Sequence, residues 1–290
     1  MPNYVMNRIT INTDEETMIK ILKAIKNDSQ LKETWPRAYE KMNETELVTT
    51  HTTIDFNKVI PMPESLDIES GSTTKNALDW WLWANRRELD AGERFEPALS
   101  DDDYVKVLDY PRYGSDFYEK MKTEEGIAEL EKYNRDIKIR ELGMKAAHNI
   151  IDYDAPTWYE WRNCYWGTKW NSCEARSSAG KYDINFTTAW SPVYPIAQKL
   201  SEQYPGIIVS ISGADEFAPS MFPTIMYVNG EEIMRHEEDD TEESWGDLWG
   251  YGCEDEEEWL EDEDEEDKEK GEGILALDKL LDKIDDLYTR

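Results

Sequence analysis

Residues 181–211 read KYDINFTTAWSPVYPIAQKLSEQYPGIIVSI, and this stretch decides the fold class. Alternating apolar residues predict a strand over Lys181–Thr188. Pro195 suits the first turn of a helix, and the apolar residues after it have helical spacing. The apolar run Ile207–Ile211 is typical of a buried strand. A strand, a helix and another strand in this order predict a fold that mixes both kinds of element.

The N-terminal residues predict a second pair of strand and helix. Tyr4–Ile11 is rich in β-branched and aromatic residues, which indicates a strand. Thr13 and Glu16 fit a capping box, and helical spacing of apolar residues continues from there to about Lys26. A further strand is predicted over Thr53–Val59, just before two closely spaced prolines.

Other stretches predict a hairpin and several helices. Thr224–Met234 is expected to turn at Asn229-Gly230, which is the strongest short hairpin signal. Helical patterns cover Ala77–Leu89 and Ser115–Ile151, and the chain closes with an amphipathic helical pattern over Ile274–Tyr288.

Together these elements predict an α+β fold with a ferredoxin-like core of the split βαβ type. The core carries a large helical insertion and an acidic C-terminal extension that ends in a helix. The predicted bounds are 1–70 and 155–235 for the core, 71–154 for the helical insertion, 236–272 for the acidic segment and 273–290 for the C-terminal helix.

Charge is the most unusual property of the sequence. The chain has 32 basic and 64 acidic residues, a formal net charge of −32. Glu231–Asp267 contains 21 acids and one base, Arg235, so this stretch carries −20 and the other residues together carry −12. Repulsion between like charges argues against direct binding to nucleic acid and against an anionic membrane as a partner.

The sequence predicts a cytoplasmic protein with reduced thiols. No stretch has the run of about 18 apolar residues that a membrane span requires, and no secretory signal is recognisable. Three cysteines, Cys164, Cys173 and Cys253, form an odd and sparse set, which argues against a disulfide framework.

No catalytic, cofactor-binding or metal-binding constellation is recognisable in the sequence. His51, His148 and His236 are far apart, and Cys164 and Cys173 have no neighbouring CxxC or HxxxH partner. A phosphate-binding glycine loop, a nucleophile elbow and a zinc-protease motif are all missing. We therefore predict a protein that is not an enzyme and that needs no cofactor or metal.

Trp158–Trp170 reads WYEWRNCYWGTKW and is the least random part of the chain. One interpretation is a platform on which bases or sugars stack. In the other, Trp158, Trp161, Trp166 and Trp170 pack between the sheet and the helical insertion. Because the chain is strongly acidic, we favour packing.

Aromatic and apolar residues are set among the acids of Glu231–Asp267. Trp245 and Trp249 are four residues apart, so short helical turns would present them on one side. We predict that the carboxylates steer this segment to a basic surface and that the aromatic residues anchor it there. The alternative is a disordered acidic run with incidental aromatic residues. The predicted partner-binding residues are Trp245, Leu248, Trp249, Tyr251, Glu256, Glu257, Trp259 and Leu260.

Several blocks of the sequence resemble one known family. The blocks are Met1–Asn3 (MPN), Asn7–Thr10 (NRIT), Phe56–Pro63 (FNKVIPMP), Trp166–Asn171 (WGTKWN), Phe186–Pro192 (FTTAWSP) and Leu200–Pro205 (LSEQYP). They resemble the YubB-type ferredoxin-like proteins of phages and plasmids. The resemblance implies a ferredoxin-like core and a mobile-element origin, and it implies no catalytic residues. In size and acidity the chain is also similar to the anti-defence inhibitors of phages, including the Gabija anti-defence proteins.

These features predict a phage-encoded accessory protein that binds and inhibits a bacterial antiphage defence complex by stoichiometric protein–protein interaction. A Gabija-type nuclease system is one such complex, and the basic DNA-binding groove of a nuclease complements an acidic segment. The protein would act in the host bacterial cytoplasm, and its amphipathic helices suggest a homo-oligomer. The alternatives are an acidic DNA mimic that occupies a nucleic-acid-binding site, a phage structural or scaffold protein, and an enzyme with an unrecognised site.

Overall fold

The computed structural model describes residues 3–51, 53–86, 94–96, 98–111, 114–176, 183–217 and 219–250. These residues belong to one compact unit, Met1–Gly250. The predicted C-terminal helix, residues 273–290, and the acids beyond residue 250 lie outside the described residues.

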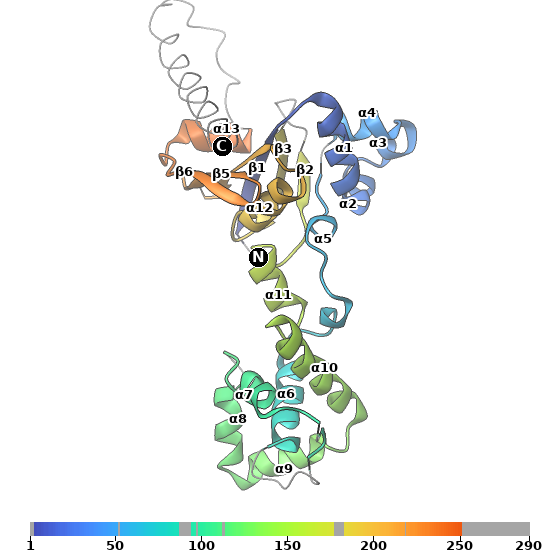
Figure 1. The fold of residues 1–290 in the computed structure, drawn as a ribbon, viewed down its shortest axis with the longest axis vertical. Coiled ribbons are helices and arrows are strands. Elements are labelled where there is room, and N and C mark those ends of the chain that lie inside the picture. Colours follow the sequence, from blue (N-terminus) through green and yellow to red (C-terminus); the bar gives the residue numbers. More distant parts are fainter. Residues whose placement is uncertain are drawn as a thin grey trace, which may run out of the picture. The chain divides into compact units, whose positions relative to one another are not determined.

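Six antiparallel strands form one sheet in the order β2-β3-β1-β4-β5-β6 (Figure 1). The strands are β1 (Tyr4–Asn12), β2 (Cys173–Arg176), β3 (Asp183–Ala189), β4 (Ile208–Asp215), β5 (Met221–Val228) and β6 (Glu231–His236). β1 lies between β3 and β4, where Ile9 pairs with Ile184 on one side and with Ile211 on the other. The two strands of the 181–211 stretch are therefore the two neighbours of β1.

The connections make a ferredoxin-like core. β3, α12 (Tyr194–Gln203) and β4 form a split βαβ unit, because β3 and β4 are parallel and antiparallel β1 lies between them. β1 and α1 (Glu15–Ile25) begin a second such unit, which β2 completes on the far side of β3. The predicted α+β class and split βαβ core are confirmed, and β5 and β6 extend the sheet.

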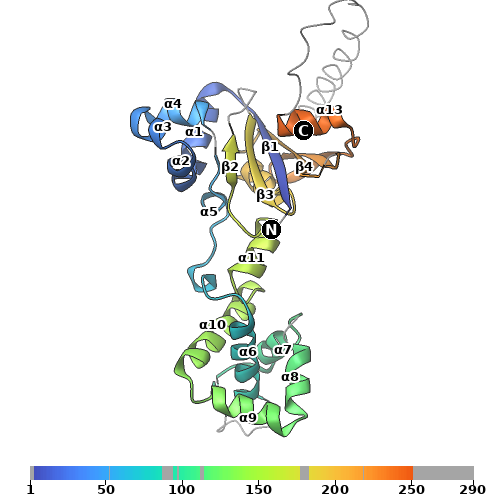
Figure 2. The same cartoon turned by 180° about the vertical axis from the view of Figure 1, so that it is seen from behind.

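The main hydrophobic core lies on one face of the sheet. Ile9 and Ile11 of β1 point to that face, where side chains of α1 and α12 cover them. α12 lies in front of the strands in Figure 1 and behind them in Figure 2. Met6 of β1 and Ala214 of β4 point to the opposite face, where α13 (Glu242–Trp249) packs on them. Both faces of the sheet are thus covered where β1 and β4 meet.

Two local predictions are confirmed in detail. Asn229 and Gly230 have φ values of 52° and 82°, the left-handed conformation that a tight hairpin turn between right-twisted strands requires. They join β5 to β6. Pro195 lies in the first turn of α12, where a missing backbone N–H costs nothing.

A second hydrophobic core lies among helices within residues 72–153. The helices are α6 (Ser72–Ala84), α7 (Asp101–Leu108), α8 (Gly114–Met121), α9 (Glu124–Tyr133) and α10 (Ile137–Tyr153). Trp80 and Trp81 of α6 are fully buried in this core. α10 approaches α6 closely, because a Cβ on Gly143 would lie only 2.3 Å from the carbonyl oxygen of Ala77. Glycine at this position therefore sets how near the two helices come.

The remaining elements are short helices. They are α2 (Asp28–Thr34), α3 (Pro36–Lys41), α4 (Glu44–Thr50), α5 (Phe56–Val59), the 3-10 turn η1 (Glu64–Leu66) and α11 (Trp158–Tyr165). The sequence patterns did not indicate α2, α3, α4, α7 or β2. Among the described residues, none of the helices combines the length and the apolar character that crossing a membrane requires.

The strand predicted over Thr53–Val59 is wrong. Residues 56–59 form α5 instead, because the Asp55 side chain accepts a hydrogen bond from the backbone N–H of Asn57 at 3.0 Å and caps a helical turn. Phe56 and Val59 are buried in α5, and a short run of apolar residues suits a buried helical turn as well as a strand, so their apolar character does not distinguish the two.

Two helix boundaries also differ from the prediction. The cap of α1 is Asp14 and not Thr13, since the Asp14 carboxylate accepts from the Thr17 backbone N–H at 2.9 Å. The single long helix expected over Ser115–Ile151 is divided into α8, α9 and α10. Thr123 and Asp136 cap the new starts, so each break coincides with a side chain that can replace a lost backbone partner.

Candidate functional site

α13 is the described part of the predicted partner-binding segment. It begins at Thr241, whose side-chain oxygen accepts from the Ser244 backbone N–H at 3.1 Å. Glu242 and Glu243 lie in the first turn, where their charge interacts favourably with the helix dipole. Gly250 ends the helix with a φ of 75°, a conformation that glycine adopts without strain.

The apolar side of α13 packs on the sheet. Leu248 and Trp249 are 6% and 7% exposed and join Met6 and Ala214 in a small hydrophobic cluster. Trp245 is partly buried and packs against the same cluster. An otherwise exposed apolar patch of the sheet is thereby covered from within the chain.

Two hydrogen bonds fasten the tryptophans of α13. The indole N–H groups of Trp245 and Trp249 both donate to the backbone oxygen of Asp215, at 2.7 and 3.0 Å. The two rings have their centroids 6.1 Å apart. Both tryptophans therefore contact the same end of β4.

The structure changes the interpretation of the predicted anchors. Trp245 and Trp249 lie on one side of a helix, as expected, but that side faces the protein's own sheet. Their side chains have a packing role here, and the binding of a partner by them stays a prediction. The other predicted residues, Tyr251, Glu256, Glu257, Trp259 and Leu260, lie outside the described residues.

The acids next to these tryptophans remain at the surface. Residues 237–247, from here on called the acidic segment, are the described acid-bearing part of the predicted segment 236–272 and contain seven acids and no base. All seven are exposed except Glu238, which is partly exposed. Asp240 accepts from the Met221 backbone N–H at 2.7 Å, and Asp247 pairs with Arg8 of β1 at 2.5 Å. The segment is therefore fastened to β5 and β1 and holds its carboxylates in place.

The Trp158–Trp170 segment is divided between core and surface. Trp161 and Trp166 are 4% and 1% exposed, and the Trp166 indole N–H donates to the Ile60 backbone oxygen at 2.9 Å. Packing, the interpretation we favoured, is confirmed for these two residues. Trp158 and Trp170 are partly exposed instead and line a cleft of about 560 Å³ beside the start of α6.

Basic side chains lie against the tryptophan rings of this segment. The Arg162 guanidinium is 5.0 Å from the Trp158 ring centroid and 4.8 Å from that of Trp166. Burial lowers the pKa of Arg162, and the negative charge of Asp67 opposes this lowering in part. The Lys169 ammonium lies 3.8 Å from the Trp170 centroid. Cation–π attraction thus orients both basic groups.

A polar joint connects the WGTKW block to the FTTAWSP block. Thr168 donates from its hydroxyl to the Ala189 backbone oxygen at 2.9 Å and accepts from the Ala189 N–H at 3.2 Å. Thr188 donates to the Ser191 backbone oxygen at 2.7 Å and accepts from the buried Asn7 amide at 2.8 Å. The joint holds the loop after α11 against the end of β3.

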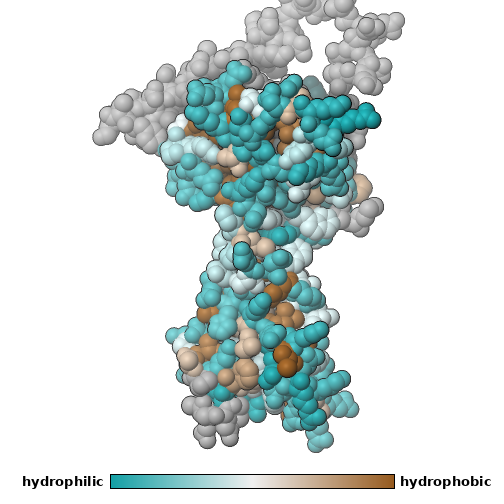
Figure 3. Space-filling view, turned by 90° about the vertical axis from the view of Figure 1, so that its right-hand side faces the viewer, coloured by the Kyte–Doolittle hydropathy of each residue, from teal (hydrophilic) through white to brown (hydrophobic). Residues whose placement is uncertain are grey.

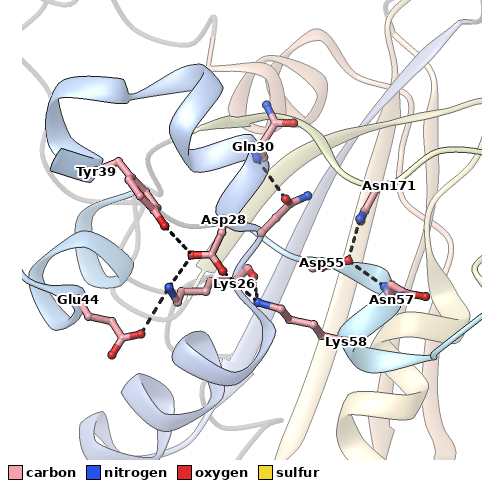
Figure 4. A network of polar contacts seen from close by, with 10 residues as sticks. Lys26, Asp28, Gln30, Tyr39, Glu44, Asp55, Asn57, Lys58 and Asn171 are labelled. Carbon is pink, nitrogen blue, oxygen red and sulfur yellow. Dashed lines mark hydrogen bonds and ion pairs between the residues drawn. The ribbon is translucent and has the colours of Figure 1, made fainter.

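Figure 4 shows another polar network, at the start of α2. The Asp28 carboxylate lies 2.6 Å from the Lys26 ammonium and 3.3 Å from that of Lys58, and the Tyr39 hydroxyl donates to it at 3.3 Å. Burial raises the pKa of Asp28, but the hydrogen bonds and charges of the two lysines outweigh it and lower the pKa overall. The network ties α2 to α5 and has a structural role.

The histidines and cysteines are not brought together. His51 packs edge-on against Trp35, and His148 lies 3.3 Å from a Glu96 carboxylate oxygen. Cys164 is exposed, Cys173 is partly buried in β2, and Cys253 lies outside the described residues. In the part of the chain that the structure describes, no three His, Cys, Asp or Glu side chains form a group suited to a metal ion.

Comparisons with known proteins do not assign the chain to a family. No family model matches it, and no curated protein matches it. Among solved structures, the chain is similar to a protein api92 from Yersinia pseudotuberculosis, of the family model DUF1281, with 8% identity and a TM-score of 0.33. That match covers 83% of this chain and 99% of the other. A likeness at this level carries no argument about family or function.

Proposed function

We propose that the protein is a phage-encoded accessory protein that binds and inhibits a bacterial antiphage defence complex, such as a Gabija-type nuclease system. The observation that supports this best is the acidic segment, residues 237–247, which α13 fastens to the sheet. Seven carboxylates without a basic residue among them suit a partner with a basic surface. Nuclease complexes have basic surfaces, because their substrate is a polyanion.

The way the segment is held makes it a better binding surface than a free tail. Asp240, Asp247 and the two tryptophans of α13 hold it in place before a partner arrives. Less conformational entropy is then lost on binding than when a disordered acidic run becomes ordered. Figure 3 shows another face, the right-hand side of Figure 1, where hydrophilic side chains dominate and apolar ones gather only in small groups.

Charge neutralisation tests this proposal. One variant carries glutamine or asparagine at five exposed or partly exposed acids, Glu237, Glu238, Asp239, Glu242 and Glu243, and keeps Asp240 and Asp247, which hold the segment. The matched control neutralises five exposed glutamates of the helical region, Glu119, Glu124, Glu125, Glu131 and Glu141. Both variants change the net charge by the same amount.

The readouts are plaque formation on bacteria that carry the defence system and association with the purified nuclease complex. We expect the segment variant to associate at least about tenfold more slowly at low salt and to lose inhibition, because charge steering governs the rate of encounter. The control should inhibit like the unmodified protein. Undiminished inhibition by the segment variant would refute the role of this surface. The inhibitor proposal as a whole would be refuted if the protein formed no complex with any defence nuclease.

A DNA mimic would act through the same segment and differs in one measurement. A mimic competes with duplex DNA for the nuclease, so added DNA should displace it. An inhibitor that binds elsewhere on the complex leaves DNA binding intact.

A further inference from the structure

The cleft of about 560 Å³ beside α6 stands apart from the acidic segment and plays no part in the function proposed above. One wall comes from the tryptophan-rich segment, with Trp158 and Trp170. The other comes from the start of α6, with Ser70, Ser72 and Lys75. Pockets that bind small molecules commonly have volumes of about 300–1,000 Å³. The cleft therefore fits a small ligand and not a folded domain.

The two tryptophans of the cleft remain partly exposed, unlike the other two tryptophans of the segment. Trp161 and Trp166, from the same segment, are buried in the core. Burial of an indole ring is favourable, so a ligand that covers the partly exposed rings of a cleft gains binding free energy. Flat aromatic ligands recover it by stacking.

Lys169 is held at this cleft by two aromatic rings. Its ammonium lies 3.8 Å from the Trp170 centroid and 4.2 Å from that of Trp190. The positive charge is therefore kept at one place before any ligand arrives, so less entropy is lost when an anion binds it.

Trp190 adopts an unfavourable backbone conformation to reach this position. Its φ is 73°, in the left-handed region that bulky residues avoid. Its backbone N–H donates to the Asn3 oxygen at 2.9 Å. The ring is nevertheless 43% exposed, so the strain does not serve to fill a core. Strain that surrounding contacts maintain at an exposed site is typical of functional positions.

The polar groups of the cleft define the kind of ligand. The lining contains two lysines, Lys75 and Lys169, and one acid, Glu160, so it has a positive balance in a strongly acidic chain. Glu160 accepts from the Thr157 hydroxyl at 2.5 Å, which orients its carboxylate. Lysines suit phosphate oxygens, and a carboxylate suits the hydroxyl groups of a ribose.

We propose that this cleft binds a mononucleotide, with the base against Trp158 or Trp170 and the phosphates near Lys169 and Lys75. A free nucleotide fits the volume, whereas a long nucleic acid would meet the repulsion of a chain with a net charge of −32.

The experiment measures quenching of tryptophan fluorescence and isothermal titration with the full chain and four probes: ATP, AMP, adenosine and inorganic phosphate. We expect saturable binding of ATP and AMP with a Kd below about 1 mM. Adenosine should bind at least about tenfold more weakly because it lacks the phosphates. Inorganic phosphate should not compete with ATP at equal concentration, since it has no ring to stack.

Two substitutions test the assignment of the site. Lys169→Met keeps most of the stem between the two rings and removes the charge, and it should weaken ATP binding at least about tenfold while adenosine binding is unchanged. Lys199→Met, which removes an exposed lysine of α12 paired with Glu202, should bind ATP like the unmodified protein. The proposal would be overturned if neither nucleotide gave a saturable signal up to about 5 mM. It would also be overturned if the Lys169→Met protein bound ATP as tightly as the unmodified protein.

Discussion

Replacing Trp249 with alanine tests whether α13 is a separable element fastened to the sheet. The side chain is 7% exposed, and its indole N–H donates to the Asp215 oxygen at 3.0 Å. Truncation of a buried tryptophan costs about 3–5 kcal/mol, of which the lost hydrogen bond is about 1 kcal/mol. α13 has eight residues, and its main contacts are with β1 and β4. A loss of this size is large for so short a helix, so we expect α13 to detach while the sheet stays folded.

Hydrogen exchange read by mass spectrometry distinguishes local detachment from global unfolding. Peptides that cover residues 242–250 should exchange about 100-fold faster in Trp249→Ala, which corresponds to about 3 kcal/mol. Peptides from β1 and β3 should keep their protection. Phe217→Ala is the matched control, because Phe217 is an aromatic residue in the loop after β4 that is 66% exposed. It should change neither set of peptides.

Two outcomes would refute this reasoning. Unchanged exchange of residues 242–250 would mean that Trp249 does not hold α13. Equal loss of protection in α13, β1 and β3 would mean that the helix belongs to the cooperative core and cannot detach on its own. If α13 detaches as expected, the acidic segment becomes a tail, and inhibition by the protein should weaken with it.

Three further predictions concern stability. Trp166→Ala should lower the free energy of unfolding by about 3–5 kcal/mol in a urea titration, because Trp166 is 1% exposed in the main core. Lys120→Met should also lower the free energy of unfolding by about 3–5 kcal/mol, because it removes the ion pair of the fully buried Asp79, at 2.7 Å. The control Lys122→Met removes an exposed ion pair and should lower the free energy of unfolding by less than about 1 kcal/mol. The lowered pKa of Asp28 means that its carboxylate stabilises the fold above the ordinary value of 3.8, and this contribution is lost as the pH falls through the lowered value. The stability advantage over Asp28→Asn should therefore be full well above the ordinary value of 3.8 and should shrink as the pH falls below it, and an advantage that does not change with pH would contradict it.

Local patterns were sufficient for most of the sheet. β-Branched and aromatic residues located β1, alternation of apolar residues located β3, Asn229-Gly230 located the hairpin, and Pro195 located the start of α12. The sequence did not predict β2, because its four residues have no apolar alternation and form a strand only by pairing with β3. Elements of this length depend more on their neighbours than on their own residues.

The candidate sites were only partly predictable. The sequence drew attention to Trp158–Trp170 but could not separate the core residue Trp166 from the cleft residue Trp170. That distinction depends on distant parts of the chain, since Trp166 donates to Ile60 and Lys169 lies between Trp170 and Trp190. The local signal was that Lys169 directly precedes Trp170 in the sequence.

By itself, the sequence determined the α+β class, the strong negative charge of Glu231–Asp267 and the placement of Trp245 and Trp249 on one side of a helical turn. These properties depend on residue type and short spacing, which any conformation of the chain retains. Only the tertiary structure decided which surface those tryptophans cover. An apolar ring is stabilised equally by a partner or by its own sheet, because burial from water is not directional. Met6 and Ala214 lie exposed on the sheet unless α13 covers them, so the rings turn inward and the carboxylates beside them remain at the surface.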